Sequence, residues 1–318
     1  MDLIYTNANG EDQGVLAAYS FDLSFGASEN DFELTVSADA APIDYGATVY
    51  IEGTEYGGTI DAMKASTRGE TVTYKGRTWH GVLNSKVIQP DAGADYYTVS
   101  GDANSVLAAL VARLGLSAFF TAADSAAGIN IQGYQFARYC KGYDGLRAML
   151  AANGAVLLIE WRGRAAVLSA APVVDYTQAP FDGDMATLTV EQTQQKVNHL
   201  ICLGKGDLAA REVIHLYVDQ YGQIGNTQHY TGADEIADVY ENANSEDLRK
   251  DGMARLAELQ NSDKAEIVLS EADDPDIDIG DIVGAHEIRS GVRVSAAVSQ
   301  KIVKIQNGTV KVEYKLGE

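Results

Sequence analysis

Residues 45–90 constrain the fold more than any other stretch, because short apolar runs there are separated at close intervals by glycine. The runs are rich in β-branched and aromatic residues, and alternate side chains in such runs cover one face of a sheet. Glycine lets the backbone reverse between them. This pattern predicts an antiparallel meander, with apolar strand residues at Val49 and Ile51, Val72 and Tyr74, Val82, and Val87 and Ile88.

A similar pattern closes the chain between residues 280 and 317. The pair Gly280 and Val283 repeats the spacing of Gly46 and Val49, and the motif Val312-x-Tyr314-Lys315 repeats Val72-x-Tyr74-Lys75. The repeat predicts two related β modules. Within the second module, Asn307-Gly308 between apolar strands predicts a hairpin turn.

The middle of the chain changes its hydrophobic period. Residues 101–116 have apolar side chains at helical spacing, with Asp102 or Asn104 as the N-cap and Gly115 at the C-terminal end. A second helix is predicted over residues 144–153, and a hairpin with a turn at Arg162-Gly163 over residues 155–169. Residues 15–37 before the meander predict two further strands, because apolar and polar residues alternate there.

From residue 185 strand patterns return, interrupted by one helix between residues 245 and 261 with Ser245 as its expected N-cap. The fold class predicted is therefore mainly β with an α+β insertion, containing two small antiparallel β-barrel domains. The expected domains are a first β-barrel over residues 1–95, an α+β domain of two helices and a hairpin over 96–180, and a second β-barrel with one helix over 181–318.

Charge and hydropathy exclude several classes of function. The formal net charge of −21 on 318 residues argues against specific nucleic-acid binding, which needs a concentrated Lys and Arg surface. The sequence contains no run of 18 apolar residues, so no membrane span is predicted, and the N-terminus lacks a signal-peptide pattern. Cys140 and Cys202 are the only cysteines, and two buried free thiols are expected.

No catalytic motif is present, since phosphate loops, zinc-protease motifs, nucleophile elbows and paired Cys-x-x-Cys are all missing. We therefore predict no catalytic, cofactor-binding or metal-binding residues and no cofactor. The five histidines are expected to be structural or at the surface: His80, His199, His215, His229 and His286. The acidic segment from Asp273 to Asp281 is interpreted as a solvated loop and strand face, with cation binding by its carboxylates left open.

Trp79 and Trp161 have two interpretations. They either pack in a core or interface, which the sequence favours, or form a platform on which sugars stack.

Residues 57–90 resemble the first barrel of siphophage and prophage tail hub proteins, a group that is similar to contractile-tail baseplate hubs. The matching residues are Gly57, Gly58, Ile60, Tyr74, Gly76, Arg77, Thr78, Val82, Leu83 and Pro90. The resemblance continues at residues 240–259, at Gly280-Asp281-Ile282-Val283 and at the ending from Asn307 to Gly317. It thus spans nearly the whole chain.

The resemblance implies a nonenzymatic virion protein of the phage tail tip or baseplate. It implies a homotrimeric ring, in which two barrels per subunit match a six-fold tail tube. The implied partners are further copies of the chain, the tail tube and the tip or tape-measure proteins, and the ring would let DNA pass along an acidic wall. Two alternatives stay open: a tail-associated cell-wall hydrolase, either glycosidase or peptidase, and a carbohydrate-binding module.

Overall fold

The structure is a computed structural model that describes residues 1–66, 69–177, 186–191, 196–260, 264–270, 277–286, 293–306 and 308–317. The chain divides into two compact units. Unit 1 comprises Met1–Thr189 and Glu266–Leu316, and unit 2 comprises Val190–Ala265 with Gly317–Glu318. Among the described helices, none is long and apolar enough to cross a membrane.

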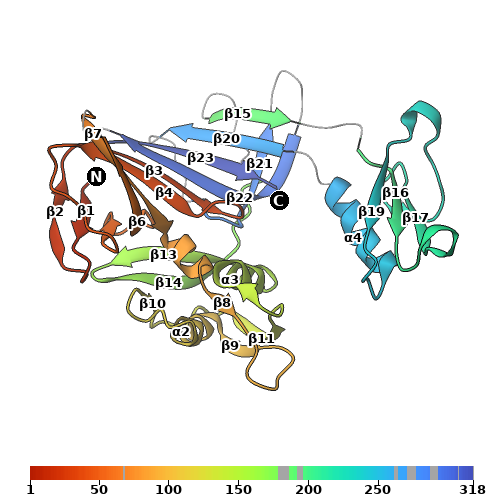
Figure 1. Ribbon diagram of the computed structural model, residues 1–318, viewed down its shortest axis with the longest axis horizontal. Helices are drawn as coiled ribbons and strands as arrows, with labels where there is room; N and C mark the ends of the chain where they lie inside the picture. Colours follow the sequence, from red (N-terminus) through yellow and green to blue (C-terminus); the bar gives the residue numbers. More distant parts are fainter. Residues whose placement is uncertain are drawn as a thin grey trace. The chain divides into compact units, whose positions relative to one another are not determined.

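A 12-stranded sheet forms the larger part of unit 1 (Figure 1). Its strands follow the order β15-β20-β23-β22-β3-β4-β7-β6-β5-β1-β2, with β21 also paired to β22. The bounds are β1 Leu3–Thr6, β2 Asp12–Leu16, β3 Tyr19–Gly26, β4 Asp31–Ser37, β5 Thr48–Tyr50, β6 Gly57–Ala65, β7 Thr71–Thr78, β15 Ala186–Glu191, β20 Lys264–Ser270, β21 Ile282–His286, β22 Arg293–Gln306 and β23 Thr309–Leu316.

The mainly β fold is confirmed, but the predicted closure of two separate barrels is not found, because no sheet among the described residues closes on itself. The reason is the pairing of β22 with β3, in which Val303 lies opposite Leu23 and Ile305 opposite Phe21. This pairing extends the N-terminal strands with the C-terminal ones instead of closing each module on itself. The two stretches that resemble each other in sequence therefore belong to one continuous sheet.

Alternation along β3, β4 and β23 gives this part of the sheet one apolar and one polar face. In β3, Phe21, Leu23 and Phe25 are buried, while Asp22 between them is exposed. The strands predicted over residues 15–37 are thus confirmed. Gln306 pairs with Thr309, so β22 and β23 form a hairpin where the sequence predicts one, while Asn307 itself lies outside the described residues.

An α+β layer lies between β7 and β15 in the sequence. The bounds of its elements are α1 Trp79–Asn84, β8 Val87–Ile88, β9 Thr98–Asp102, α2 Ala103–Arg113, β10 Phe120–Ala122, β11 Asn130–Gln135, β12 Cys140–Lys141, α3 Gly142–Ala151, β13 Ala155–Arg162 and β14 Ala165–Pro172. Strands β10, β14 and β13 form a small sheet in that order, with β10 parallel to β14. Figure 1 shows this sheet below the large one, with α2 on its far side.

The two predicted helices and the hairpin of this layer are confirmed as α2, α3 and the pair of β13 with β14. Asp102 caps α2 by accepting a hydrogen bond from the Asn104 amide at 3.0 Å. Gly115 follows the helix with a positive φ of 69°, a conformation that glycine adopts without a Cβ clash.

The expectation of a strand at Val82 and Leu83 was wrong, because residues 79–84 form helix α1. The Thr78 side chain accepts from the Gly81 amide and starts the helix. Gly81 also leaves room for the backbone of Asn30, whose carbonyl oxygen would lie 2.1 Å from a Cβ at that position. Tertiary packing against the sheet thus overrides the strand propensity of the apolar residues.

Stacked aromatic rings join the α+β layer to the large sheet. Trp79 of α1 stacks on Trp161 of β13 with ring centroids 4.7 Å apart, and Trp161 stacks on Tyr50 of β5 at 4.5 Å. Backbone bonds support the stack, since the Trp161 amide donates to Thr54 and its carbonyl accepts from Gly53. The α+β segment therefore folds as part of unit 1.

A buried ion pair holds β22 to the turn between β5 and β6. Lys301 Nζ lies 2.8 Å from Glu55 Oε1, and Glu55 Oε2 lies 3.7 Å from Nε2 of His80. Burial opposes the charge of Lys301, but the Glu55 carboxylate outweighs burial and raises the lysine pKa well above its usual value. Burial, together with the cations of Lys301 and Arg147, lowers the pKa of His80 to about 3, so the ring stays neutral and stacks on Phe25.

Unit 2 contains a four-stranded sheet in the order β18-β17-β16-β19, with helix α4 packed on it. Its core consists of Leu200, Cys202, Leu216, Val218, Leu248 and Leu256. The bounds are β16 His199–Leu203, β17 Val213–Val218, β18 Ile224–Gly225, β19 Ala237–Glu241 and α4 Leu248–Gln260, with short 3-10 turns at Leu208–Ala210 and Gly232–Asp234.

The helix predicted in residues 245–261 is confirmed as α4, but Ser245 is not its N-cap. Asp247 accepts from the Lys250 amide at 3.0 Å, while Ser245 donates to Asp251 inside the helix at 2.5 Å. The helix consequently begins two residues later than the sequence indicates, because the Asp247 carboxylate takes the capping position.

Candidate interaction surface

Charged side chains cross the polar face of the large sheet in a row, which we call the charge row. The strand register places Lys304 of β22 opposite Asp22 of β3, Asp22 opposite Glu33 of β4, and Glu33 opposite Lys75 of β7. Like charges directly opposite destabilise a sheet, whereas unlike charges stabilise it. The two lysines flank the two carboxylates, so the row has no net charge.

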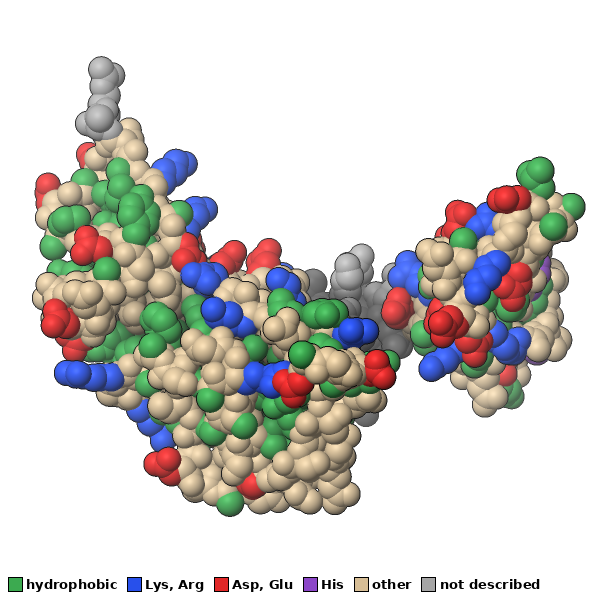
Figure 2. Space-filling view, turned by 60° about the horizontal axis from the view of Figure 1, so that its bottom comes forward, with side chains coloured by type: hydrophobic (Ala, Val, Ile, Leu, Met, Phe, Trp, Pro, Cys, Tyr) green, Lys and Arg blue, Asp and Glu red, His purple; other side chains and the backbone are tan. Residues whose placement is uncertain are grey.

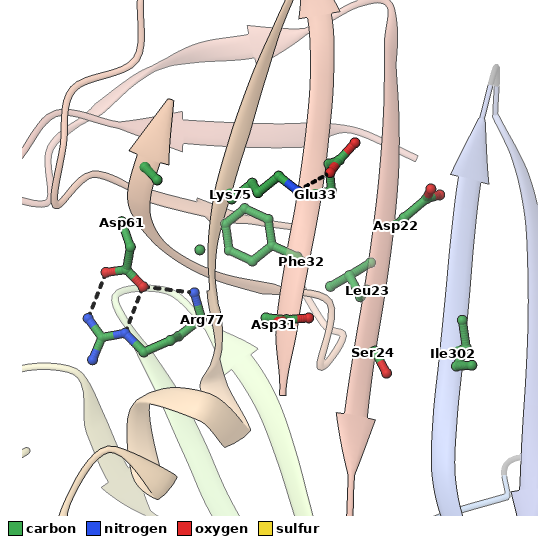
Figure 3. A pocket seen from close by; sticks show the side chains of 12 residues that line it. Asp22, Leu23, Ser24, Asp31, Phe32, Glu33, Asp61, Lys75, Arg77 and Ile302 are labelled. Atoms are coloured by element: carbon green, nitrogen blue, oxygen red, sulfur yellow. Dashed lines mark hydrogen bonds and ion pairs between the residues drawn. The ribbon is translucent and has the colours of Figure 1, made fainter. Parts of the chain in front are cut away.

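A hollow of about 440 Å³ lies over this row on β3, β4, β6, β7 and β22 (Figure 3). At one side, Arg77 donates through Nε and Nη2 to the two carboxylate oxygens of Asp61, each at 2.7 Å. Asp61 is the extra residue of a β-bulge in β6, where the register shifts between Ile60 and Ala62. The bulge turns its carboxylate toward Arg77.

Two carboxyl groups in the hollow have perturbed pKa values. Partial burial raises the pKa of Asp22, with Lys304 opposing the shift and Glu33 adding to it. Burial and then Glu29 raise the pKa of Asp31, while Lys75 opposes the shift. Lys75 itself ion-pairs with Glu33 at 2.7 Å, and the hydrogen bond that it donates to that carboxylate raises the lysine pKa.

The exposed charged side chains of the charge row are accessible to ion-pair with a protein that docks on them. The Lys75 and Glu33 side chains are 59% and 48% exposed, so their ion pair is weak in water and is easily rearranged. Figure 2 shows basic and acidic side chains interspersed on the presented face of unit 1, the larger body. A surface of this kind favours a partner with its own alternating charges rather than a polyanion.

The residues singled out in the sequence lie in different places. Trp79 and Trp161 are 0% and 5% exposed, which contradicts a sugar-stacking platform and confirms core packing. His80 is buried, His229 is exposed, and His199 and His215 lie together in unit 2. His286 ends β21, and nothing is described of its side chain.

Of the acidic segment, Asp273, Asp274 and Asp276 lie outside the described residues. Asp281 is buried, and its carboxylate accepts from the amides of Val174 and Asp278 at 2.8 and 2.9 Å. Cys202 is buried and Cys140 half-buried, both as free thiols. Burial raises the pKa of each thiol, which makes them poor nucleophiles.

The charge row was missed by sequence reasoning. Each member sits at the polar position of an alternating strand, which is a visible signal, but the row exists only through strand register. The pairing of Lys304 with Asp22 joins residues far apart in the chain, and alternation alone does not indicate that partner.

Unit 1 combines an open, mainly β sheet with an α+β layer, and unit 2 is a small second unit. Chains with this class of fold occur among solved structures of phage tail proteins. The chain is similar to the 43 kDa tail protein of prophage MuSo2 from Shewanella oneidensis, with a TM-score of 0.59 and 12% identity, over 99% of this chain and 98% of that one. It is also similar to the tail protein from Neisseria meningitidis, with a TM-score of 0.53 and 13% identity over 100% and 96% of the two chains.

A third similar structure is the prophage tail protein gp18 from Listeria monocytogenes, with a TM-score of 0.51 and 13% identity over 99% and 94% of the two chains. No family model and no curated protein matches the sequence. The expected resemblance to phage tail proteins is therefore confirmed at the level of the fold.

Proposed function

We propose that the chain is a nonenzymatic structural protein of a phage or prophage tail, which forms a hub ring joining the tail tube to the tip. The observation that carries this proposal is the likeness over 99% of this chain and 98% of the Shewanella oneidensis prophage tail protein. A match over the whole length of both chains means that the open sheet, the α+β layer and unit 2 recur together. The partners proposed are further copies of the chain, the tail tube and the tip or tape-measure proteins.

In the proposed ring, three copies associate and DNA passes along the axis. The net charge of −21 per chain would disfavour trapping of DNA phosphates. The charge row contributes nothing to this repulsion, because its two lysines balance its two carboxylates. We therefore assign the charge row to protein contacts and expect the channel wall to be formed by another, more acidic surface.

Electron microscopy of tails tests the proposal. Particles are prepared from cells that express the complete set of tail genes, with and without the gene for this chain, and with an affinity tag on the chain. We expect tagged chain at the end of the tube as a three-fold ring, and no completed tails in its absence. Completed tails that lack the chain would contradict a hub role.

A second candidate function is cell-wall hydrolysis, which one observation favours. Asp22 and Asp31 line the same hollow and both have raised pKa values, as the general acid of a glycosidase does. A gel containing peptidoglycan distinguishes the two functions. A cleared band that is lost in both Asp22→Asn and Asp31→Asn would establish hydrolysis, and an uncleared gel would count against it.

A further inference from the structure

Two histidines and a glutamate form a continuous chain of contacts on unit 2, which the hub function does not use. Nδ1 of His199 lies 2.6 Å from Oε1 of Glu235, and Nε2 of His199 lies 2.8 Å from Nδ1 of His215. Tyr217 stacks on the His199 ring with centroids 4.4 Å apart and limits its rotation. We call His199, His215 and Glu235 the histidine chain.

The register of the sheet produces this arrangement. His199 of β16 lies opposite Tyr217 of β17, and Ile201 lies opposite His215, so the two histidines are diagonal neighbours. Leu200 and Cys202 point into the core beneath α4. Because side chains alternate along a strand, the histidines project from the face opposite to α4.

The hydrogen-bond partners of His199 determine which of its ring nitrogens carries a proton. A carboxylate only accepts hydrogen bonds, so His199 donates from Nδ1 to Glu235 and keeps a lone pair on Nε2. That lone pair faces the Nδ1 atom of His215. His199 is buried at 8% exposure, whereas His215 is exposed and lies against the Tyr217 ring with centroids 6.3 Å apart.

From this geometry we propose that His199 and His215 bind a divalent transition-metal ion of the zinc or nickel class between their facing nitrogens. Imidazole nitrogen suits these ions, and a metal-binding histidine ordinarily donates its other ring N–H to a carboxylate, as His199 does to Glu235. On binding, the His215 proton moves from Nδ1 to the exposed Nε2, which frees Nδ1 as the second ligand.

The required movement is small. Two bonds of about 2.0 to 2.1 Å in tetrahedral geometry place the nitrogens about 3.3 Å apart. The present separation of 2.8 Å therefore has to open by about 0.5 Å, and the His215 ring, the more exposed of the two, has to turn so that Nδ1 points at the ion. Among the described residues no group of three metal-binding side chains occurs, so water completes the coordination and leaves positions open to a partner's ligand.

The test is titration of the full chain with zinc chloride, followed by isothermal calorimetry and by NMR of the histidine ring nitrogens. We expect one ion per chain, with the largest ring shifts at Nε2 of His199 and Nδ1 of His215. His215→Ala should remove saturable binding, and it changes only an exposed side chain. Glu235→Gln should weaken binding by about tenfold, as loss of an outer carboxylate does.

His229→Ala is the matched control, because His229 is an exposed histidine of the same unit outside the histidine chain. It should bind zinc as the parent chain does. Equal binding by His215→Ala and the parent, or no binding by the parent at about 1 mM zinc, far above the concentrations at which structural zinc sites fill, would overturn the proposal.

Discussion

Nζ of Lys301 in β22 lies 2.8 Å from Oε1 of Glu55, so a buried lysine of the C-terminal strands pairs with a half-buried carboxylate from the turn that precedes β6. Lys301 also lies near the rings of Tyr56 and Tyr314, at 5.9 and 5.6 Å from their centroids. The ion pair fastens the C-terminal strands to the N-terminal ones at the point where the continuous sheet meets α1.

Replacing Lys301 by methionine should destabilise unit 1 by up to about 3 kcal/mol, because it removes the cation that pairs with the half-buried Glu55 carboxylate. Urea unfolding followed by tryptophan fluorescence measures this, since both tryptophans belong to unit 1. The double variant Lys301→Met with Glu55→Gln should recover much of the loss. Lys75→Met, which breaks the exposed pair with Glu33, should change stability far less, because water screens that pair. Equal losses in both single variants would refute the buried-pair argument.

Gly252 of α4 should resist substitution although alanine is the better helix former. A Cβ at this position would lie 2.4 Å from Sγ of Cys202. Overpacking of this kind costs about 1 to 3 kcal/mol, which offsets the gain of about 1 kcal/mol in helix propensity. Circular dichroism during urea unfolding should show Gly252→Ala destabilised and the pair Gly252→Ala with Cys202→Ala restored. The exposed Ala254 serves as control, since Ala254→Gly loses only helix propensity.

Asp102 should give unit 1 a pH-dependent stability. Hydrogen bonds from the amides of Ala127, Gly128 and Asn104 hold its pKa below the ordinary 3.8. A carboxyl group with a lowered pKa in the folded state stabilises above the unfolded value of 3.8 and loses this contribution as the pH falls through the folded pKa. The melting temperature of Asp102→Asn should thus lie below that of the parent at pH 7, and the two should converge below pH 3.8. If the difference in melting temperature between the two proteins persisted below pH 3.8, the charge of Asp102 would not be its cause.

Cell-wall sugars should leave tryptophan fluorescence unchanged. Both indoles are buried, and their stack with Tyr50 fills the space between β5, α1 and β13. Titration with soluble muropeptides, with acrylamide quenching in parallel, measures their accessibility. A saturable emission change on adding sugar would revive the carbohydrate-binding alternative.

Local features of the fold were predictable where one short segment determines them. The cap at Asp102 and the glycine at position 115 each act within a few residues, and the structure confirms both. Helix α1 was missed because the residues around Val82 favour strands, while contacts with the distant Asn30 backbone decide the outcome.

The continuous sheet and both clusters of polar side chains depend on register between distant strands. Pairing of β22 with β3 brings Gln300 opposite Gly26, and no local pattern specifies that partner. The same holds for His199 and His215, whose separation along the chain says nothing of their contact until the diagonal arrangement of β16 and β17 is known. The three-domain division of the sequence stays a prediction.

The position of β22 in the interior of the large sheet has a consequence for biosynthesis. Strand β3 cannot gain its second neighbour until residues 300–306 have left the ribosome, so the chain up to Gln306 must emerge before unit 1 reaches its native state. A nascent chain that stops before that point leaves one edge of β3 unpaired, and an unpaired strand edge is a site at which chains aggregate.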